Sequence, residues 1–175
     1  KGDYRVVLDC FSALNDSELD KQERIFSALI IFYEEFNNLL DLSNFPELTQ
    51  AVNKMYWFFN CGDDKGVGAT KHHKLIDWDG DAQLIASAIN NVAKTEIRIE
   101  PYVHWWTFMG YYLAIGESPL ATIVNIRSKI AENKKLEKHE KKFRHDNPQY
   151  FIWNSTSVEQ KEAEQEILAM WNAGN

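Results

Sequence analysis

Residues 102–113 read YVHWWTFMGYYL, and this stretch decides the fold. Wound as a helix, it carries aromatic side chains around its whole circumference, and such a helix lies either in a core or in an interface. We favour a central core helix over residues 100–115, opened by Pro101 and ended by Gly116. A partner-binding surface formed by part of it is the alternative, since Trp and Tyr are frequent interface anchors. Gly110 costs roughly 1 kcal/mol relative to Ala inside a helix, so it indicates close approach of a neighbouring element.

Helical spacing also dominates the rest of the chain, because apolar residues recur three and four positions apart in nearly every segment. The expected fold class is therefore all-α, a single-domain bundle of about six to seven helices. The other helices are expected at residues 6–14, 21–40, 46–60, 78–92, from 119 onward, and 158–171.

Local signals mark several helix starts. Asp20 with Glu23 forms a capping-box pattern, and Asp77 offers an N-cap for the helix that follows it. Ser118 precedes a proline, which is tolerated in a first turn. Residues 62–73 contain three glycines and no apolar period, so we expect a mobile loop there.

The charge is unevenly distributed. The chain carries a net charge of −7, which disfavours nucleic-acid binding. Residues 127–144 hold eight Lys or Arg against three Glu, a local charge of +5, and the remainder carries −12. Since Phe143 is the single aromatic residue among these cations, we expect a solvated or partner-facing helix rather than an RNA site. We therefore divide the chain into a helical core domain at 1–130 and, at 131–175, a charged helix extension with a C-terminal amphipathic helix, packed on the core or projecting from it.

Membrane and secretory signals are absent from the sequence. No apolar run approaches the roughly 18 residues of a membrane span, and the first apolar run is interrupted by Asp9, so no signal peptide is expected. Cys10 and Cys61 lie in apolar patterns near aromatic residues, which predicts reduced core thiols and, with them, a cytoplasmic protein.

Metal sites and catalysis are weakly supported. Asp77, Asp79 and Asp81 have the spacing of a calcium loop, but the Gly and Glu that such a loop requires further on are Ala82 and Ala88. We instead assign Asp77 to helix capping and the other two aspartates to the positive end of the helix dipole.

A second possible metal site lies at the adjacent residues His72 and His73, which have no second His pair to support them. Neither a nucleophile elbow nor a phosphate-binding loop is present. We expect no metal, no cofactor and no enzyme activity.

Several short elements, taken together, resemble one phage family, the gene-product-fifteen proteins of Listeria-type siphophages. The similarity covers residues 3–130, and it is most specific at residues 104–108. Members of that family carry a segment like a β-hairpin before the element that begins here at Asp3, so we expect that a small N-terminal β-hairpin of the family is missing from this sequence. The elements that carry the resemblance are residues 3–8 (DYRVVL), residues 14–19 (LNDSEL), Asp77 and Trp78 with Asp81, and residues 104–108 (HWWTF).

The resemblance implies a role in tail morphogenesis. The family is encoded beside the tape-measure gene and is similar to tail assembly chaperones, which bind the tape-measure protein and help tail-tube assembly in the host cytoplasm. A structural adaptor of the tail is the alternative function, and a metal-dependent enzyme is the third. Self-assembly into a homo-oligomer is compatible with the chaperone role.

Two sets of aromatic and acidic residues follow from this reading. The expected contacts for apolar helices of the tape-measure protein are drawn from Trp57, Phe58, Trp105, Tyr111 and Tyr112, and tail-tube proteins are the other expected partners. The expected family markers, which we also place in the core, are Asp77, Trp78, Asp81, His104, Trp105, Trp106 and Phe108.

Overall fold

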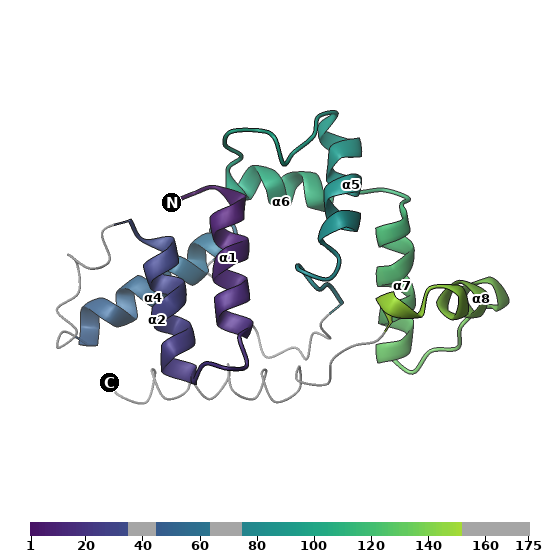
Figure 1. Ribbon diagram of the computed structural model, residues 1–175, viewed down its shortest axis with the longest axis horizontal. Coiled ribbons are helices and arrows are strands. Elements are labelled where there is room, and N and C mark those ends of the chain that lie inside the picture. Colours follow the sequence, from purple (N-terminus) through teal and green to yellow (C-terminus); the bar gives the residue numbers. More distant parts are fainter. Residues whose placement is uncertain (35–44, 64–74, 152–175) are drawn as a thin grey trace. The chain divides into compact units, whose positions relative to one another are not determined.

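The computed structural model describes residues 1–34, 45–63 and 75–151 (Figure 1). Within these ranges the protein forms helices and no strand, so the all-α prediction is confirmed. The elements are α1 (Tyr4–Asn15), α2 (Lys21–Phe32), α4 (Phe45–Phe59), α5 (Ala82–Ala93), α6 (Trp105–Leu113), α7 (Pro119–Ala131), α8 (Lys138–Asp146) and the 3-10 helix η1 (Pro148–Tyr150).

The described residues group into two compact units. Unit 1 contains α1, α2, α4 and Tyr102–Trp106, and unit 2 contains α5, α7, α8, η1 and the part of α6 that follows Trp106. The division at residue 130 that the charge distribution suggested stays a prediction. Residues 64–74 and 158–171, for which a loop and a last helix were expected, lie outside the described part of the chain.

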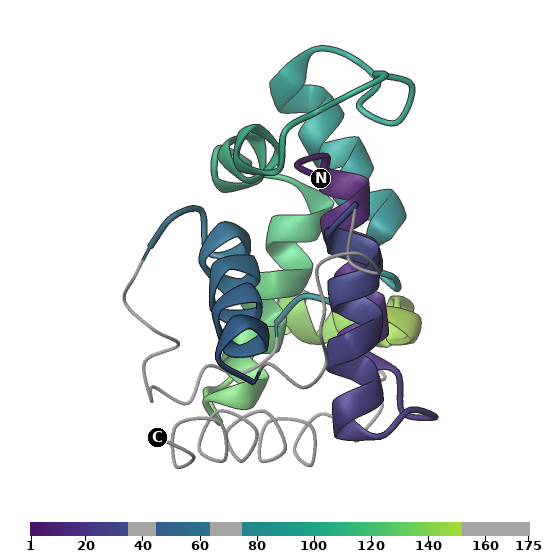
Figure 2. The same cartoon turned by 90° about the vertical axis from the view of Figure 1, so that its left-hand side faces the viewer.

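In unit 1, α1 and α2 pair closely (Figures 1 and 2). The capping box predicted for α2 is confirmed, because the Asp20 carboxylate accepts the backbone N–H groups of Gln22 and Glu23 while Glu23 accepts that of Asp20. Both helices bury small and branched side chains at their contact, where the Cys10 Sγ lies 3.5 Å from the Ala28 carbonyl. Local capping and an apolar stripe are thus sufficient to set this pair.

Helix α2 is shorter than expected. It ends at Phe32 rather than near residue 40, because Tyr33 takes an extended conformation (φ −92°, ψ 131°). The Tyr33 hydroxyl donates to the Ala51 carbonyl on α4 (2.8 Å), and the Phe32 ring lies 5.4 Å from that of Phe59. Contacts of Phe32 and Tyr33 with α4 therefore end the helix, although the apolar spacing continues beyond Phe32. Residues 35–40 of the predicted helix lie outside the described residues.

Helix α6 begins later than the expected residue 100. The segment before it runs extended, and an isolated antiparallel β-bridge joins Asp3 to His104. The Tyr4 N–H donates to Val103 (2.9 Å), the Trp105 N–H donates to Gly2 (2.8 Å), and the Asp3 carboxylate accepts the Val103 N–H (2.9 Å). The start predicted at Pro101 is wrong because the chain start supplies partners for these backbone groups.

In unit 2, α5 and α7 contact each other, and their buried apolar residues include Ile85 and Ile89 on α5 and Ile123 on α7. The predicted start of α7 is confirmed, since the Ser118 hydroxyl accepts the Ala121 N–H (3.1 Å). The expected continuation of this helix into the charged region is wrong. It ends at Ala131, and α8 starts as a separate helix after Asn133 adopts a positive φ of 54°.

The two cysteines differ. Cys10 is buried as predicted, and burial raises the pKa of its thiol to about 12. Cys61 is exposed, so its assignment to the core is wrong; it sits in the turn that ends α4, with a φ of 57°. Within the described residues, no helix is both long and apolar enough to cross a membrane.

Asp3 ties the start of α1 to the segment before α6. Burial raises its pKa, but hydrogen bonds from the Arg5 side chain and from the Val103 and Arg5 backbone outweigh this effect and hold the pKa below its usual value. A lowered folded-state pKa contributes stability above the unfolded pKa of about 3.9, and that contribution is lost as pH falls through the folded value.

We expect Asp3→Ala to destabilise the protein by about 1 kcal/mol at pH 7, because it removes an N-cap acceptor and the bond to Val103. Thermal unfolding at pH 7 should show this as a loss of roughly 2–4 °C, and the difference from wild type should shrink towards pH 3. Asp3→Asn keeps an N-cap acceptor and is the control. An unchanged difference between wild type and Asp3→Ala across that pH range would show that ionisation of Asp3 contributes nothing.

Candidate partner-binding surface

Two tryptophans form the exposed edge of the aromatic cluster in unit 1. Trp57 on α4 is 41% exposed and Trp106 at the start of α6 is 37% exposed. Their rings lie 5.6 Å apart in an edge-to-face arrangement, and the Trp106 Nε1–H donates to the Phe58 carbonyl (3.0 Å). The indole N–H of Trp106 therefore has its hydrogen-bond partner inside the protein, and the exposed part of the side chain is apolar.

Three further aromatic side chains extend this cluster. The Phe58 ring lies 5.8 Å from that of Trp106 and 5.4 Å from that of His104. Tyr102 is 57% exposed, and both its hydroxyl and the His104 ring lie beside Gly2. We call Trp57, Phe58, Tyr102, His104 and Trp106 the aromatic patch.

Gly62 closes α4 beneath the two tryptophans. Its φ is +84°, and its N–H donates to the Trp57 carbonyl (2.9 Å). A Cβ at this position would lie 3.3 Å from the Trp106 ring and 3.5 Å from the Trp57 ring. A glycine is therefore required both by the left-handed backbone and by the rings that cover it.

The aromatic residues predicted as partner contacts differ in where they lie and in how exposed they are. Trp57 and Phe58 lie together in the aromatic patch. Trp105 is only 1% exposed, with its Nε1–H donating to the Phe59 carbonyl (2.9 Å), so it belongs to the core and is not offered to a partner. Tyr111 and Tyr112 are half-buried in unit 2, where the Tyr112 ring packs 5.4 Å from that of Trp78.

The residues predicted as core markers also divide. Phe108 is buried and lies 6.4 Å from Trp78, ring to ring, whereas Trp106 is substantially exposed. His104 immediately precedes α6, and its Nδ1 accepts the Trp106 N–H (3.2 Å). The expectation that Gly110 marks a close approach is wrong, since it is exposed and no neighbouring element among the described residues comes within 4 Å of where its Cβ would be. Helix α6 is therefore buried along one face only.

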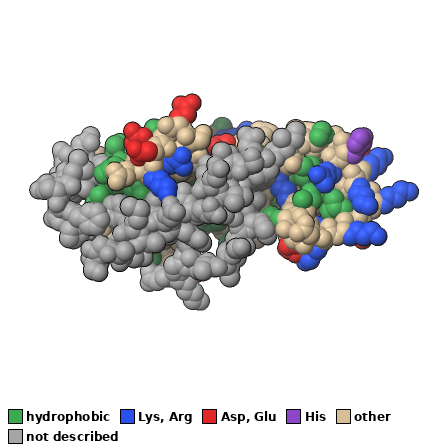
Figure 3. Space-filling model, turned by 90° about the horizontal axis from the view of Figure 1, so that it is seen from below, with side chains coloured by type: hydrophobic (Ala, Val, Ile, Leu, Met, Phe, Trp, Pro, Cys, Tyr) green, Lys and Arg blue, Asp and Glu red, His purple; other side chains and the backbone are tan. Residues whose placement is uncertain are grey.

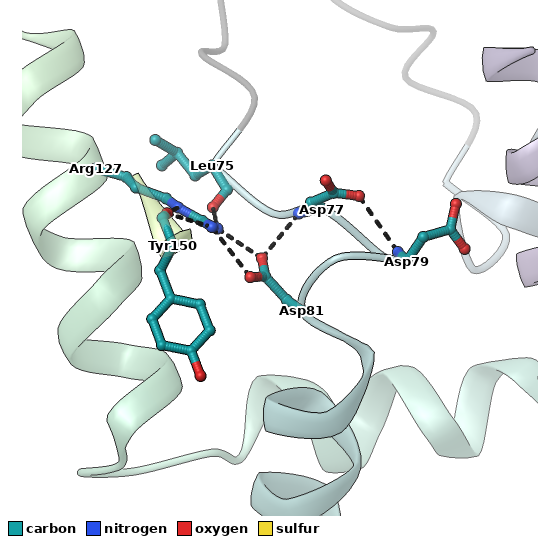
Figure 4. Close-up of polar contacts among 6 residues, drawn as sticks. All are labelled: Leu75, Asp77, Asp79, Asp81, Arg127 and Tyr150. Carbon is teal, nitrogen blue, oxygen red and sulfur yellow. Dashed lines mark hydrogen bonds and ion pairs between the residues drawn. The ribbon is translucent and has the colours of Figure 1, made fainter. Parts of the chain in front are cut away.

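In unit 2, the predicted core marker Asp81 forms a buried ion pair with Arg127, which the sequence did not single out (Figure 4). They are 1% and 8% exposed, and the Arg127 guanidinium donates two hydrogen bonds of 2.6 and 3.0 Å to the Asp81 carboxylate. Arg127 also donates to the Leu75 carbonyl (2.9 Å) and, through two nitrogens, to the Tyr150 carbonyl (2.9 and 2.7 Å). The segment at residues 75–81 and the end of η1 thus both bond to the guanidinium on α7.

Asp77 does not cap α5, contrary to prediction. The helix begins at Ala82, and Asp77 lies at the start of a turn in which its carbonyl accepts the Asp81 N–H (2.8 Å). Its own N–H donates to the Asp81 carboxylate (3.0 Å), and its carboxylate accepts the Asp79 N–H (3.3 Å) (Figure 4). Asp81, the residue before α5, makes no side-chain cap because its carboxylate is held by Arg127. The turn is thus organised around the ion pair.

No cation-binding cluster emerges from the described residues, in which no three His, Cys, Asp or Glu side chains are grouped to hold a metal ion. Of the aspartates considered for a calcium loop, Asp81 is already neutralised by Arg127. His72 and His73 lie outside the described residues.

Arg127 was assigned to a solvated basic stretch, and this is wrong. Its position could have indicated burial, because it stands four residues after Ile123 and seven after Leu120, on the apolar face of the same helix. Glu140 on α8 is a second missed residue: it is buried and pairs with Lys129 (2.5 Å). Counting charges along the sequence does not distinguish such paired groups from solvated ones.

We expect Arg127→Met to cost about 3–5 kcal/mol, because it leaves the Asp81 carboxylate buried without its partner. Equilibrium urea unfolding measures this loss. Arg144→Met, an exposed arginine on α8, is the matched control and should change stability by less than about 0.5 kcal/mol. Equal effects of the two substitutions would exclude the ion pair as an organising interaction, and adding Asp81→Leu to Arg127→Met should recover part of the loss.

Comparison with known proteins gives one match. The family described as "Bacteriophage Gp15 protein" matches residues 1–150, a span that includes the aromatic patch, the Asp81–Arg127 pair and all helices of the described residues. No curated protein and no solved structure matches the chain. The similarity seen in residues 3–130 is therefore confirmed at family level, and the chain belongs to the bacteriophage Gp15 protein family.

Proposed function

We propose that this phage protein acts in tail morphogenesis as an assembly chaperone that binds the tape-measure protein and helps tail-tube subunits assemble around it. The observation that supports this most directly is the aromatic patch. The protein works, on this proposal, in the cytoplasm of the bacterial host, where it performs a binding task and no catalysis.

The patch has the chemistry needed to hold an apolar helix. A large aromatic side chain buries 150–250 Å² and is among the most effective interface anchors. Trp57 and Trp106 stand on different helices with edge-to-face rings, so together they offer a ridged apolar surface instead of a single projection. Such a surface suits side chains spaced three and four residues apart on a partner helix.

The absence of catalysis in this proposal is supported by how buried charges are used. Asp81, Arg127 and Glu140 are the buried charged residues of the described segments, and each is consumed by an ion pair. Groups held in this way position backbone and are poorly placed for proton transfer to a ligand. The exposed aromatic residues are then the surface best suited to function.

Coexpression with the cognate tape-measure protein tests the proposal. We expect the tape measure to become more soluble and to copurify with this protein. Trp57→Ala should weaken the complex by about 2 kcal/mol, roughly 30-fold in Kd, because an exposed aromatic anchor is lost while the core is spared.

Two controls separate binding from folding. Ile99→Ala removes an apolar side chain that is 78% exposed in unit 2 and should leave copurification unchanged. Trp105→Ala should instead lower thermal stability by about 3–5 kcal/mol, as expected for a core aromatic residue. A tape measure that is equally soluble alone would refute the chaperone role, and finding this protein at fixed stoichiometry in purified particles would favour a structural adaptor.

A further inference from the structure

A shallow, open concavity on unit 2 is lined almost entirely by basic side chains and two apolar residues. The lining residues are Lys135, Leu136, Lys141, Arg144, His145 and Pro148. Lys and Arg side chains gather over α8 and the segment before it on the face drawn in Figure 3. No acidic residue lines the concavity, although the chain as a whole carries a net charge of −7.

The cations of this concavity are unused within the described fold. Lys129 pairs with Glu140, and Lys134 pairs with Glu132. In contrast, Lys135, Lys141 and Arg144 form no ion pair with any described carboxylate, and all three are exposed. Neighbouring cations repel one another, so their gathering around an apolar floor favours an acidic ligand that also carries an apolar side chain.

We propose that the concavity docks the acidic turn of a second copy of this chain, residues 16–20 between α1 and α2. This turn reads DSELD and contains three carboxylates and no base. Glu18 and Asp20 are exposed, and Leu19, which is half-buried, provides an apolar side chain for Leu136 and Pro148. The chain itself therefore carries both complementary surfaces.

The turn is rigid enough to present its charges. The Asp16 carboxylate accepts the Glu18 N–H (2.9 Å), and the Asp20 carboxylate caps α2. Glu18 is left with its carboxylate in solvent, so it is the residue that pairs most directly with the concavity. Binding then costs little ordering of the backbone.

Net repulsion between two copies does not prevent this contact. At physiological ionic strength the Debye length is about 8 Å, so charges beyond the contact are largely screened while the facing groups still attract. Because the concavity and the turn are different surfaces, the association is head-to-tail, and it extends beyond a dimer when both surfaces of each copy are used.

Sedimentation velocity over a range of protein concentrations at about 0.15 M salt tests the proposal. We expect the sedimentation coefficient of the wild-type protein to rise with concentration, and this rise to disappear at high salt. Lys141→Glu with Arg144→Glu should weaken self-association about tenfold, since it reverses two charges that line the concavity. Ser17→Lys with Glu18→Lys should do the same from the other surface.

Combining the two pairs of substitutions makes the test specific. A chain that carries all four substitutions places two Glu in the concavity and two Lys in the turn, whose net charge changes from −3 to 0, so it should regain part of the self-association. An equimolar mixture of the two double variants pairs the wild-type turn with the wild-type concavity and the altered turn with the altered concavity, so it should associate more strongly than either variant alone. Lys138→Glu with Lys142→Glu is the matched control, because it makes the same charge change on the same helix outside the concavity and should retain most of the association.

Several outcomes would overturn the proposal. One is a wild-type sedimentation coefficient that does not depend on concentration. Another is an equal loss in the matched control, which would assign the effect to net charge. A third is tight binding of a short single-stranded RNA that depends on Lys141 and Arg144 in a protein that does not self-associate, because it would assign the concavity to nucleic acid. Thermal unfolding of each variant verifies that the fold is retained.

Discussion

The buried ion pair between Arg127 and Asp81 is the interaction on which the second unit depends. Removing two charges from water is costly, and the cost is offset only when every donor and acceptor finds a partner. Arg127 meets that condition by bonding Asp81, the Leu75 carbonyl and the Tyr150 carbonyl. The turn before α5, the middle of α7 and the end of η1 are thereby fixed by one side chain. Satisfying one guanidinium determines where three segments lie.

The same constraint shapes the first unit with different groups. The Asp3 carboxylate accepts an N–H from Val103, a hundred residues along the chain, and the Trp105 indole donates to the Phe59 carbonyl. Among the described residues, no buried side-chain nitrogen or oxygen lacks a hydrogen-bond partner. The aromatic patch is a consequence, because the indole N–H of Trp106 is satisfied inward at Phe58 and its hydrocarbon edge faces solvent.

The sequence predicted those features that depend on near neighbours. The all-α class, the capping box at Asp20 and the Ser118 start of α7 follow from residues within four positions of each other. The errors lie where a distant partner decides. Tyr33 lies outside α2 and donates a hydrogen bond to α4. Asp77 does not cap α5, because it lies in a turn whose Asp81 carboxylate pairs with Arg127. The residues before Trp105 form backbone hydrogen bonds with the N-terminal residues. No spacing rule within one segment contains such information.

The aromatic patch illustrates both what the sequence predicts and what it does not. Trp105 and Trp106 are the same residue type, but adjacent side chains on a helix point about 100° apart. Trp105 is therefore buried in the core, whereas Trp106 is exposed at the surface. The sequence therefore predicts that aromatic residues cluster here, but it does not predict which of them is exposed. If copies associate head-to-tail as proposed, each copy brings one aromatic patch to the assembly. Several weak apolar contacts would then act together through effective concentration, and a modest affinity at each patch would suffice to hold a long helical protein.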